Sequence, residues 1–547
     1  MKDAHFSGRN ITRIETLEAR IAPAAVFVFT DVDGDTVTVK TSKGTNADLA
    51  AALTFSDPNP ANPRQLQTIN LSGPPGPASP FAGTDLTVTA KRGALGGDGR
   101  VNVGYLDATG NDGGNHVDLG KVTIAGDLGR FSGGDLTPAT PAVKLHSFGE
   151  FGLNTQGAGA SYISTFNGGA KAIKVTGSVA GPEIRMLSGG VGSLTIGGNL
   201  SGDSDSRSGF IYFGGPVGIL KIGGSIIGAS GTESAQIYLD ARIGTLQIGG
   251  SVIGGAGESS GCIFGFSDIG TISIGGSLVG GSDDDSGAIQ ADGTITKITL
   301  GGSILGGSKA GAGTLTRTGF ISATALGSVT VGGSVLAGAE TGGGVLVDSG
   351  NIRATKTIGS LTVGGDIIGR PGQLVAISAQ GAEIAGKPTD IAIGKITVKG
   401  RVERVNVLAG FTKADVPVNP DAQIGTVTIG GDWIASNLIA GVHNSDGFFG
   451  DSNEFAIAIN DDAAIRSRIA AVIIKGQVIG TPSSTDASTF AIAAQQLGTV
   501  KVGGTVIPLL PGASNDTFVD ARSQPLSGSL GIFAFISAGP DVRAYEV

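Results

Sequence analysis

The sequence predicts an all-β protein built as a right-handed parallel β-helix, a solenoid of about 26 residues per turn. Three observations predict this fold. A ten-residue pattern recurs at a fixed spacing, each copy alternates apolar and polar residues, and glycine supplies 96 of the 547 residues. An average chain contains about 7 % glycine, and no collagen-like triplet accompanies the excess here. The glycines therefore belong to the repeat.

The recurring pattern runs aliphatic, Gly, any residue, aliphatic, polar, aliphatic, Gly, Gly, small polar, aliphatic. Five copies are evenly spaced and begin at Val191, Val217, Ile243, Ile269 and Ile295. Later copies follow at longer and uneven spacings, beginning at Leu326, Ile358, Ile393, Ile424, Ile469 and Leu497. A period of roughly 20 to 50 residues indicates a solenoid, a propeller or an array. A turn of about 26 residues is too short for the four-stranded blade of a propeller.

Each copy contains short strands rather than a helix. In Leu220-Lys221-Ile222 the outer residues are apolar and the middle one is polar, as expected for a strand with one buried face. The Gly-Gly pairs exclude a helix, because each glycine costs about 1 kcal/mol in a helix interior. A second short strand follows Gly-Gly, and a third segment recurs in register around Ile211, Ile237, Ile263 and Ile289.

Three strands per turn with glycine at the corners describe a parallel β-helix. We predict that residues 220–222, 246–248, 272–274 and 298–300 are neighbours in one parallel sheet. Leu246 should then lie in an inward-facing column of aliphatic side chains. The longer spacings after residue 300 should form loops at the edges, because stacked strands cannot absorb insertions.

Four regions follow from these patterns: a leader or targeting segment at 1–24, a β-rich N-terminal region and cap at 25–115, the parallel β-helix at 116–510, and a C-terminal cap at 511–547. An Asp-Gly turn within Phe29–Gly44 predicts a hairpin. Asn46 is expected to cap a short helix through Leu53. Caps matter because a bare solenoid end exposes unpaired backbone and promotes aggregation.

Composition excludes several classes of protein. The formal net charge of −9 argues against nucleic acid as a partner, because phosphates repel an acidic surface. No run of about 18 apolar residues predicts a transmembrane segment. The single cysteine, Cys262, permits neither an intrachain disulfide nor a cysteine-based zinc site. The basic start lacks the apolar core of a standard signal peptide.

The stretch Leu17-Glu18-Ala19-Arg20-Ile21 resembles the LEPR-XLL motif near the start of many large bacterial envelope proteins, matching it at Leu17, Glu18 and Arg20. The rest of the chain is similar to a family of bacterial β-strand-repeat surface proteins. The similarity rests on Phe29–Gly44, the IGGS repeats and the ending Asp541–Val547. This resemblance implies an exported, extracellular or cell-envelope repeat protein, and it implies no activity.

The best candidate for a metal site is Asp31, Asp33 and Asp35, where alternating aspartates surround a glycine turn. Hard cations such as calcium prefer carboxylate and carbonyl oxygen, although an ordinary Asp-Gly hairpin turn explains the string equally well. The four histidines, His5, His116, His146 and His443, show no ligand spacing. Trp433 is expected in the core, and Cys262 is expected to be a small rung residue rather than a nucleophile, because no local histidine offers a base. We assign no catalytic and no cofactor-binding residue.

The leading functional hypothesis is a structural or adhesive surface protein that acts through multivalent contacts without catalysis. Its partners would be extracellular polysaccharides or cell-envelope proteins. The loops after the second strands stack into a predicted acidic edge, formed by Asp203, Asp205, Glu233, Glu258 and Asp283 to Asp285.

The alternative is a polysaccharide lyase or glycoside hydrolase on a pectin-lyase-like β-helix, by analogy of fold alone. Its site would lie in the irregular stretch 370–465, where Asp390, Glu403 and Asp415 are candidates. Within the regular turns we expect no groove lined by aromatic side chains.

Overall fold

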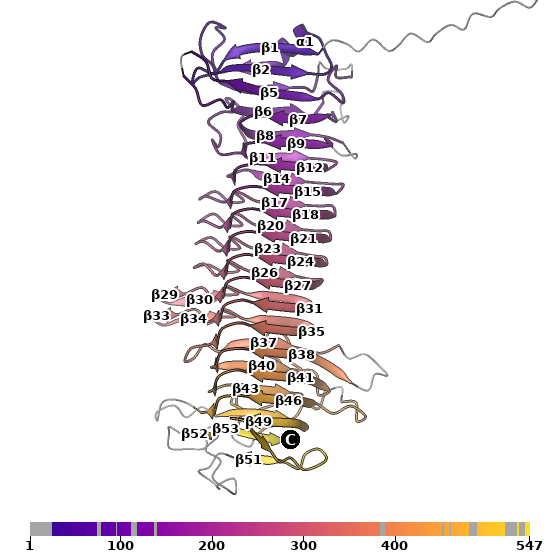
Figure 1. Cartoon of the computed structure of the whole chain (residues 1–547), viewed down its shortest axis with the longest axis vertical. Helices are drawn as coiled ribbons and strands as arrows, with labels where there is room; N and C mark the ends of the chain where they lie inside the picture. The colour runs from indigo at the N-terminus through magenta and orange to yellow at the C-terminus, as the bar shows by residue number, and fades with distance from the viewer. Residues whose placement is uncertain are drawn as a thin grey trace, which may run out of the picture.

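A computed structural model describes most of the chain, as residues 24–73, 78–94, 96–110, 117–135, 139–382, 389–450, 453–459, 461–480, 489–519, 533–534 and 542–547. The described chain is a tall stack of short strands, with the N-terminal strands at one end and the C-terminal strands at the other (Figure 1). It is nearly all β, with one large, mostly parallel sheet of 47 strands. Almost all of the predicted leader, the motif at Leu17–Ile21, His5, His116 and much of 511–547 lie outside the described residues.

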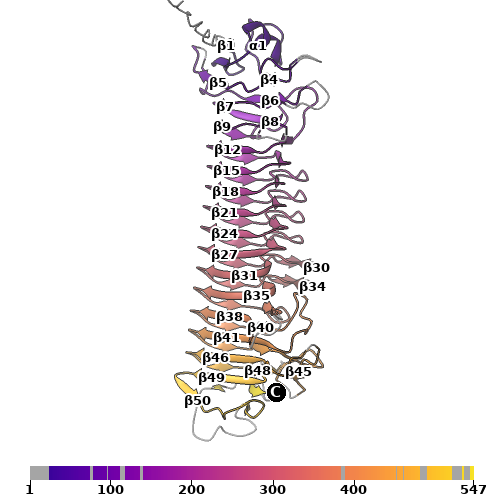
Figure 2. The same cartoon turned by 90° about the vertical axis from the view of Figure 1, so that its right-hand side faces the viewer.

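The repeat stacks as predicted into a ladder of parallel strands, here called the first ladder. β18 (Val217–Ile222), β21 (Ile243–Ile248), β24 (Ile269–Ile274) and β27 (Thr294–Leu300) follow one another as neighbours (Figure 2). Leu246 pairs with Leu220 on one side and with Ile272 on the other. The prediction of neighbouring parallel strands is confirmed.

Two further ladders complete the stack. The second ladder contains β19 (Ile226–Ile227), β22 (Val252–Ile253), β25 (Leu278–Val279) and β28 (Ile304–Leu305). The third ladder contains β14 (Glu183–Met186), β17 (Ile211–Phe213), β20 (Ile237–Leu239), β23 (Ile263–Gly265) and β26 (Ile289–Ala291). It continues through β31 (Ile321–Val331), β35 (Ile352–Val363), β37 (Val375–Ala379) and β40 (Val405–Ala409).

Aliphatic columns fill the space between the ladders. Leu220, Leu246, Ile272 and Ile298 are each 0 % exposed. Trp433, at the start of β42 (Trp433–Ile434), pairs with Val402 and is also buried. Its indole Nε1 donates to the carbonyl oxygen of Ser436 at 3.0 Å, so the one polar atom of this ring is satisfied. Trp433 is therefore a core residue, as predicted.

The Gly-Gly-Ser corner explains the repeat motif. A Cβ on Gly249 would lie 2.1 Å from the carbonyl oxygen of Gly223, one rung earlier, so only glycine allows the rungs to approach this closely. The serine that follows links the rungs through its hydroxyl. Ser251 Oγ accepts a hydrogen bond from the amide of Ser277 at 3.0 Å, and Ser225 Oγ accepts one from Ser251.

Antiparallel strands lie at both ends of the stack. β1 (Ala25–Thr30) and β2 (Thr36–Thr41) form the predicted hairpin, and β2 pairs antiparallel with β5 (Leu86–Lys91). At the other end β49 (Gln496–Val502) pairs antiparallel with β50 (Thr505–Ile507). Such strands use the backbone groups that a bare rung would expose.

Parallel pairing begins inside the region 25–115 that we predicted as a cap. β4 (Leu66–Asn70) already pairs parallel with β6 (Val103–Ala108), and β5 pairs parallel with β7 (Lys121–Ile124). The helix α1 runs from Asn46 to Ala52, but its N-cap is Thr45 rather than Asn46, because the Thr45 side chain accepts from the amide of Asp48. Within the described residues no helix is long and apolar enough to cross a membrane.

The insertions after residue 300 leave the stack between its strands, and two of them form arms at the same edge. β29 (Lys309–Ala310) pairs with β33 (Glu340–Thr341), and β30 (Gly313–Thr316) pairs with β34 (Gly344–Val347). These two small sheets stand away from the stack beside β31 and β35 (Figure 1). Both sheets lie just before third-ladder strands. The end of β34, at Val347, lines a pocket on the outside of the third ladder.

Candidate functional site

The outward face of the third ladder carries a column of aromatic rings. In each three-residue strand the first and last side chains are buried and the middle one points outward. The middle residues pair in register as Tyr212, Tyr238 and Phe264. Ring centroids lie 5.8 Å apart for the first pair and 5.5 Å for the second. Phe266, half exposed, packs edge-on against Phe264 at 5.0 Å.

The expectation that the regular turns carry no aromatic-lined groove is therefore wrong. The signal was present in the sequence, since Tyr212, Tyr238 and Phe264 stand at the constant spacing of the repeat. The prediction followed the inward isoleucines along the repeat and did not consider the middle residue of each third-ladder strand. Strand alternation places that middle position on the surface.

A wall of polar residues runs beside this column. Each is the turn residue that leads into a third-ladder strand, and each has a positive φ of 55° to 60°: Arg207, Glu233, Ser259, Asp285, Arg317 and Asp348. A left-handed conformation costs a non-glycine residue about 1 kcal/mol, which glycine avoids. A chain so rich in glycine nevertheless carries charged side chains at five of these six corners. We infer that the charged side chains, rather than the backbone conformation, account for these residues at the corners.

The wall is mixed in charge, and two carboxylates of the predicted acidic edge, Glu233 and Asp285, each lie beside an arginine in it. Arg207 Nε lies 2.5 Å from Glu233 Oε2. Arg317 holds Asp285 with two bonds, from Nε at 2.6 Å and from Nη2 at 2.7 Å. The stacking of the rungs brings each of these arginines beside a carboxylate of a neighbouring rung.

A short finger, residues 411–417, closes one end of the groove. It follows β40 and precedes β41 (Ala422–Ile429). The amides of Ala414 and Val416 donate to Thr412 Oγ1, which shapes its turn. Lys413 Nζ donates to Ser322 Oγ at 3.3 Å, across 91 residues of sequence. The finger thus folds back over earlier rungs of the third ladder.

Arg353 holds the finger in place. Its side chain is 4 % exposed, and its Nη1 and Nη2 donate to the two carboxylate oxygens of Asp415 at 2.5 and 2.8 Å. Nε donates to Asp348 at 2.5 Å, and Nη1 also reaches Ser378 Oγ at 3.0 Å. A bidentate bond of this kind fixes both distance and orientation. One buried guanidinium therefore joins the wall, the third ladder and the finger.

The column, the wall and the finger enclose a pocket of about 730 Å³. Phe264 of the column, four residues of the wall and three of the finger line it: Ser259, Asp285, Arg317, Asp348, Lys413, Ala414 and Asp415. The other lining residues come from the ladder strands and their flanking turns: Gln236, Cys262, Gln290, Phe320, Ser322, Val347 and Arg353. The size suits a small ligand or part of a longer one. The aromatic column leads into it through Phe264.

No family model matches this chain, and neither does any curated protein or solved structure with which it was compared.

One lining residue has an unsatisfied polar atom. Gln236 is 4 % exposed, and its Oε1 has no hydrogen-bond partner within the described part of the chain. Leaving a buried acceptor without a donor costs about 1–3 kcal/mol.

Cys262 also lines the pocket and is buried. Burial, more than the nearby Asp285, raises the pKa of the Cys262 thiol to about 12. A thiol in this state stays protonated and is a poor nucleophile. It serves here as a small side chain between Phe264 and Phe320.

Of the three carboxylates considered for catalysis, the structure places only Asp415 in the groove. Asp390 is buried at the start of β38 (Asp390–Val398), where its oxygens accept from the Ala382 amide and from Asn419 Nδ2. Glu403, at the end of β39 (Val402–Glu403), pairs with Arg401 at 3.1 Å. The three belong to separate local structures, and Asp415 is itself bound to Arg353.

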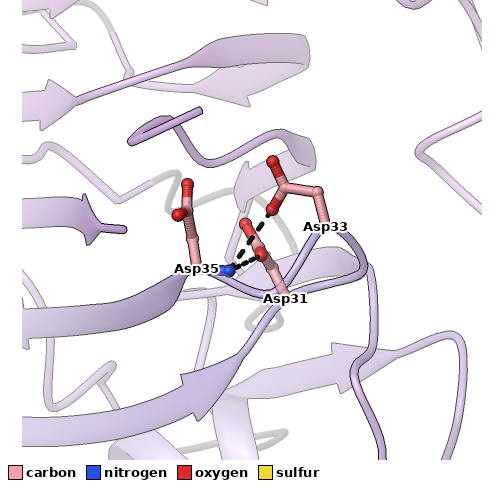
Figure 3. Close-up of side chains that lie close together, drawn as sticks. All are labelled: Asp31, Asp33 and Asp35. Carbon is pink, nitrogen blue, oxygen red and sulfur yellow. Dashed lines mark hydrogen bonds between the residues drawn. The ribbon is translucent and has the colours of Figure 1, made fainter. Parts of the chain in front are cut away.

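The candidate calcium ligands lie together at the tip of the β1–β2 hairpin (Figure 3). One oxygen from each of Asp31, Asp33 and Asp35 falls within 4.8 Å of the others. The Asp35 amide donates to Asp31 Oδ1 at 2.8 Å and to Asp33 Oδ1 at 3.4 Å, contacts typical of an Asp-Gly turn. Asp35 Oδ2 accepts from the amides of Gly99 and Arg100. The alternative of a plain hairpin turn is therefore well supported.

Two features still favour an ion at this tip. Asp35 is fully buried, and its Oδ1 has no hydrogen-bond partner among the described residues. Burial and a hydrogen bond with Asp33 raise the pKa of Asp31 to about 7, whereas the same bond lowers the pKa of Asp33. Crowded carboxylates of this kind repel one another unless a proton or a cation lies between them.

The calcium prediction has a direct test. Millimolar Ca²⁺ should raise the melting temperature of the wild type by several degrees, because an ion that binds only the folded state stabilises it. Asp33→Asn should abolish that shift, whereas Asp57→Asn, on an exposed loop, should keep it. An equal response to Mg²⁺, or no response to either ion, would leave the three aspartates as turn residues.

Proposed function

We propose that this chain is an exported or cell-surface structural protein, a right-handed β-solenoid of about 26 residues per turn that holds extended polysaccharides along the third ladder without cleaving them. The observation that carries the proposal is the aromatic column of Tyr212, Tyr238 and Phe264 leading into the pocket. Membership of the LEPR-XLL-like family of bacterial surface proteins is part of this proposal. Export and surface display follow from that resemblance.

The chemistry of the groove suits a sugar chain. Flat aromatic rings pack against the C–H faces of sugar rings, while hydroxyl groups need hydrogen-bond partners at the edges. Gln290 and Ser322 line the pocket with polar side chains. The rungs repeat along the rod, so a polymer can make many similar contacts at once. Individually weak contacts then add up to firm retention.

The carboxylates of the pocket favour binding over cleavage. Glycoside hydrolysis needs an acid and a base or nucleophile facing the scissile bond. Asp285 is bound by Arg317, and both Asp348 and Asp415 are bound by Arg353. A carboxylate whose oxygens are bound by a guanidinium does not face a scissile bond, which disfavours a catalytic role for these three aspartates.

One observation favours a second candidate, a polysaccharide lyase. Burial lowers the pKa of Lys413, against the opposing effect of Asp292 and Asp348. A lysine with a lowered pKa is a better general base, and β-elimination from a uronate begins with proton abstraction. The second candidate requires unsaturated products after incubation with uronate polymers and their loss in Lys413→Met. The proposed function requires that none form.

Substitution of the central ring tests the proposal. Tyr238 contacts Phe210, Tyr212, Phe264 and Phe266. Tyr238→Ala should weaken retention on immobilised polysaccharide by about tenfold, since a stacked ring contributes about 1 kcal/mol or more. Tyr238→Phe should keep retention close to that of the wild type.

Ile219→Ala is the matched control, because Ile219 is an exposed apolar residue of the first ladder, 47 % accessible. Melting temperatures should accompany the binding curves, so that a folding defect is recognised. Retention that is unchanged by Tyr238→Ala, or that falls equally in Ile219→Ala, would place any glycan contact elsewhere on the rod.

A further inference from the structure

The charges in the pocket are unevenly paired. Arg317 binds Asp285, and Arg353 binds both Asp348 and Asp415. The remaining cation of the lining is Lys413, and within the described residues no carboxylate forms an ion pair with its Nζ. The three carboxylates of the pocket are thus each engaged by an arginine, and Lys413 is the cation that has no anion in direct contact.

Lys413 is also poorly supplied with hydrogen bonds. Lys413 belongs to the finger and is partly buried, and its one hydrogen bond among the described residues goes to Ser322 Oγ at 3.3 Å. An ammonium group has three donors. Water inside a partly enclosed pocket solvates it less well than bulk water does, and burial accordingly lowers the pKa of Lys413. An anion in the pocket would supply both charge and acceptors.

The neighbours of Lys413 are arranged for a group with one anionic end and one apolar face. Arg317 uses Nε and Nη2 for Asp285, which leaves Nη1 outside that pair, and its side chain is 43 % exposed. Cys262, Phe264 and Phe320 form an apolar floor beside these cations. A sugar ring that carries an acidic group presents both kinds of surface.

We propose that this pocket is a subsite for the anionic group of an acidic polysaccharide, with Lys413 Nζ as the main contact and Arg317 Nη1 as the second. The inference rests on the proposed function and goes further, because it names the ligand as acidic where the aromatic column would accept a neutral chain. The anion could be a uronate carboxylate or a sulfate ester, since both offer oxygen acceptors with negative charge.

Affinity electrophoresis through gels that contain polygalacturonate, dextran sulfate or neutral galactan provides the test. Lys413→Met keeps the length of the side chain and removes its charge. It should weaken the apparent affinity for an acidic polymer about tenfold, the usual effect of one charge-assisted hydrogen bond, and change that for galactan less than about twofold. Lys413→Arg should restore most of the acidic binding.

Lys297→Met is the matched control, because Lys297 is exposed on β27 of the first ladder. If Lys413→Met weakens binding to only one of the two acidic polymers and Lys297→Met does not, that polymer identifies the anion as a carboxylate or a sulfate ester. Equal loss in both variants would indicate a general charge effect and overturn the subsite. If galactan binds the wild type and Lys413→Met leaves every polymer unaffected, the proposed function stands and the subsite is wrong. If the wild type binds no polymer, the proposed function itself is wrong.

Discussion

Leu246→Asp should destabilise the solenoid by several kcal/mol. Leu246 is 0 % exposed and is stacked directly between Leu220 and Ile272. A carboxylate at this position would have no partner in an aliphatic column, and an unpaired polar or charged group of this kind costs about 4 kcal/mol or more. Loss of the packed leucine adds the cost of a cavity.

The damage should be local at first. Stability in a solenoid is close to a sum of rung and neighbour terms, so hydrogen exchange should become faster in the strands around β21 before it does so in β46 (Arg468–Ile474). Gln247→Asp is the matched control, since Gln247 is the exposed neighbour on the same strand. An unchanged melting temperature in Leu246→Asp would contradict the inward column.

Arg353→Met should release the finger. The guanidinium is almost fully buried and bonds Asp348, Asp415 and Ser378. Its removal leaves two carboxylates without this partner, of which Asp348 is 13 % and Asp415 44 % exposed. Because Asp415 can turn to water, we expect a loss of about 2–4 kcal/mol, below the usual cost for a fully buried pair.

Limited proteolysis detects this release. Lys413 is a trypsin site that is partly buried and held against Ser322 in the wild type. In Arg353→Met the finger should be cut after Lys413 at a protease concentration that leaves the wild type intact. Arg401→Met, which breaks the surface pair with Glu403, should behave like the wild type. Equal resistance of all three proteins would show that Arg353 does not hold the finger.

The sequence was sufficient for the parts of the fold that repeat. The constant spacing of the repeat fixes which strands are neighbours, and alternation within each copy fixes which side chains face inward. Trp433 could be assigned to the core because its position in the register was known. The N-cap was misplaced by one residue, since Thr45 and Asn46 are both good caps and only the contact with Asp48 distinguishes them.

The groove was harder to predict, for two physical reasons. Its aromatic column does follow the repeat, so Tyr238 and its neighbours could have been found from the middle position of the third strand. The finger does not follow it. The contact from Arg353 to Asp415 spans 62 residues and that from Lys413 to Ser322 spans 91, and neither distance is a multiple of the period. Such contacts depend on how an irregular loop folds back, which the pattern does not encode.

The claim that the groove binds polysaccharide without cleaving it can be tested in one measurement. Size-exclusion chromatography with light scattering, run after long incubation of the protein with an acidic polysaccharide of defined length, reports both association and chain length. The account predicts that protein elutes with the polymer and that the molar mass of the polymer, once the protein is removed, is unchanged. Shortened chains after incubation with the wild type would contradict it, and unsaturated ends on those chains that are lost in Lys413→Met would identify a lyase.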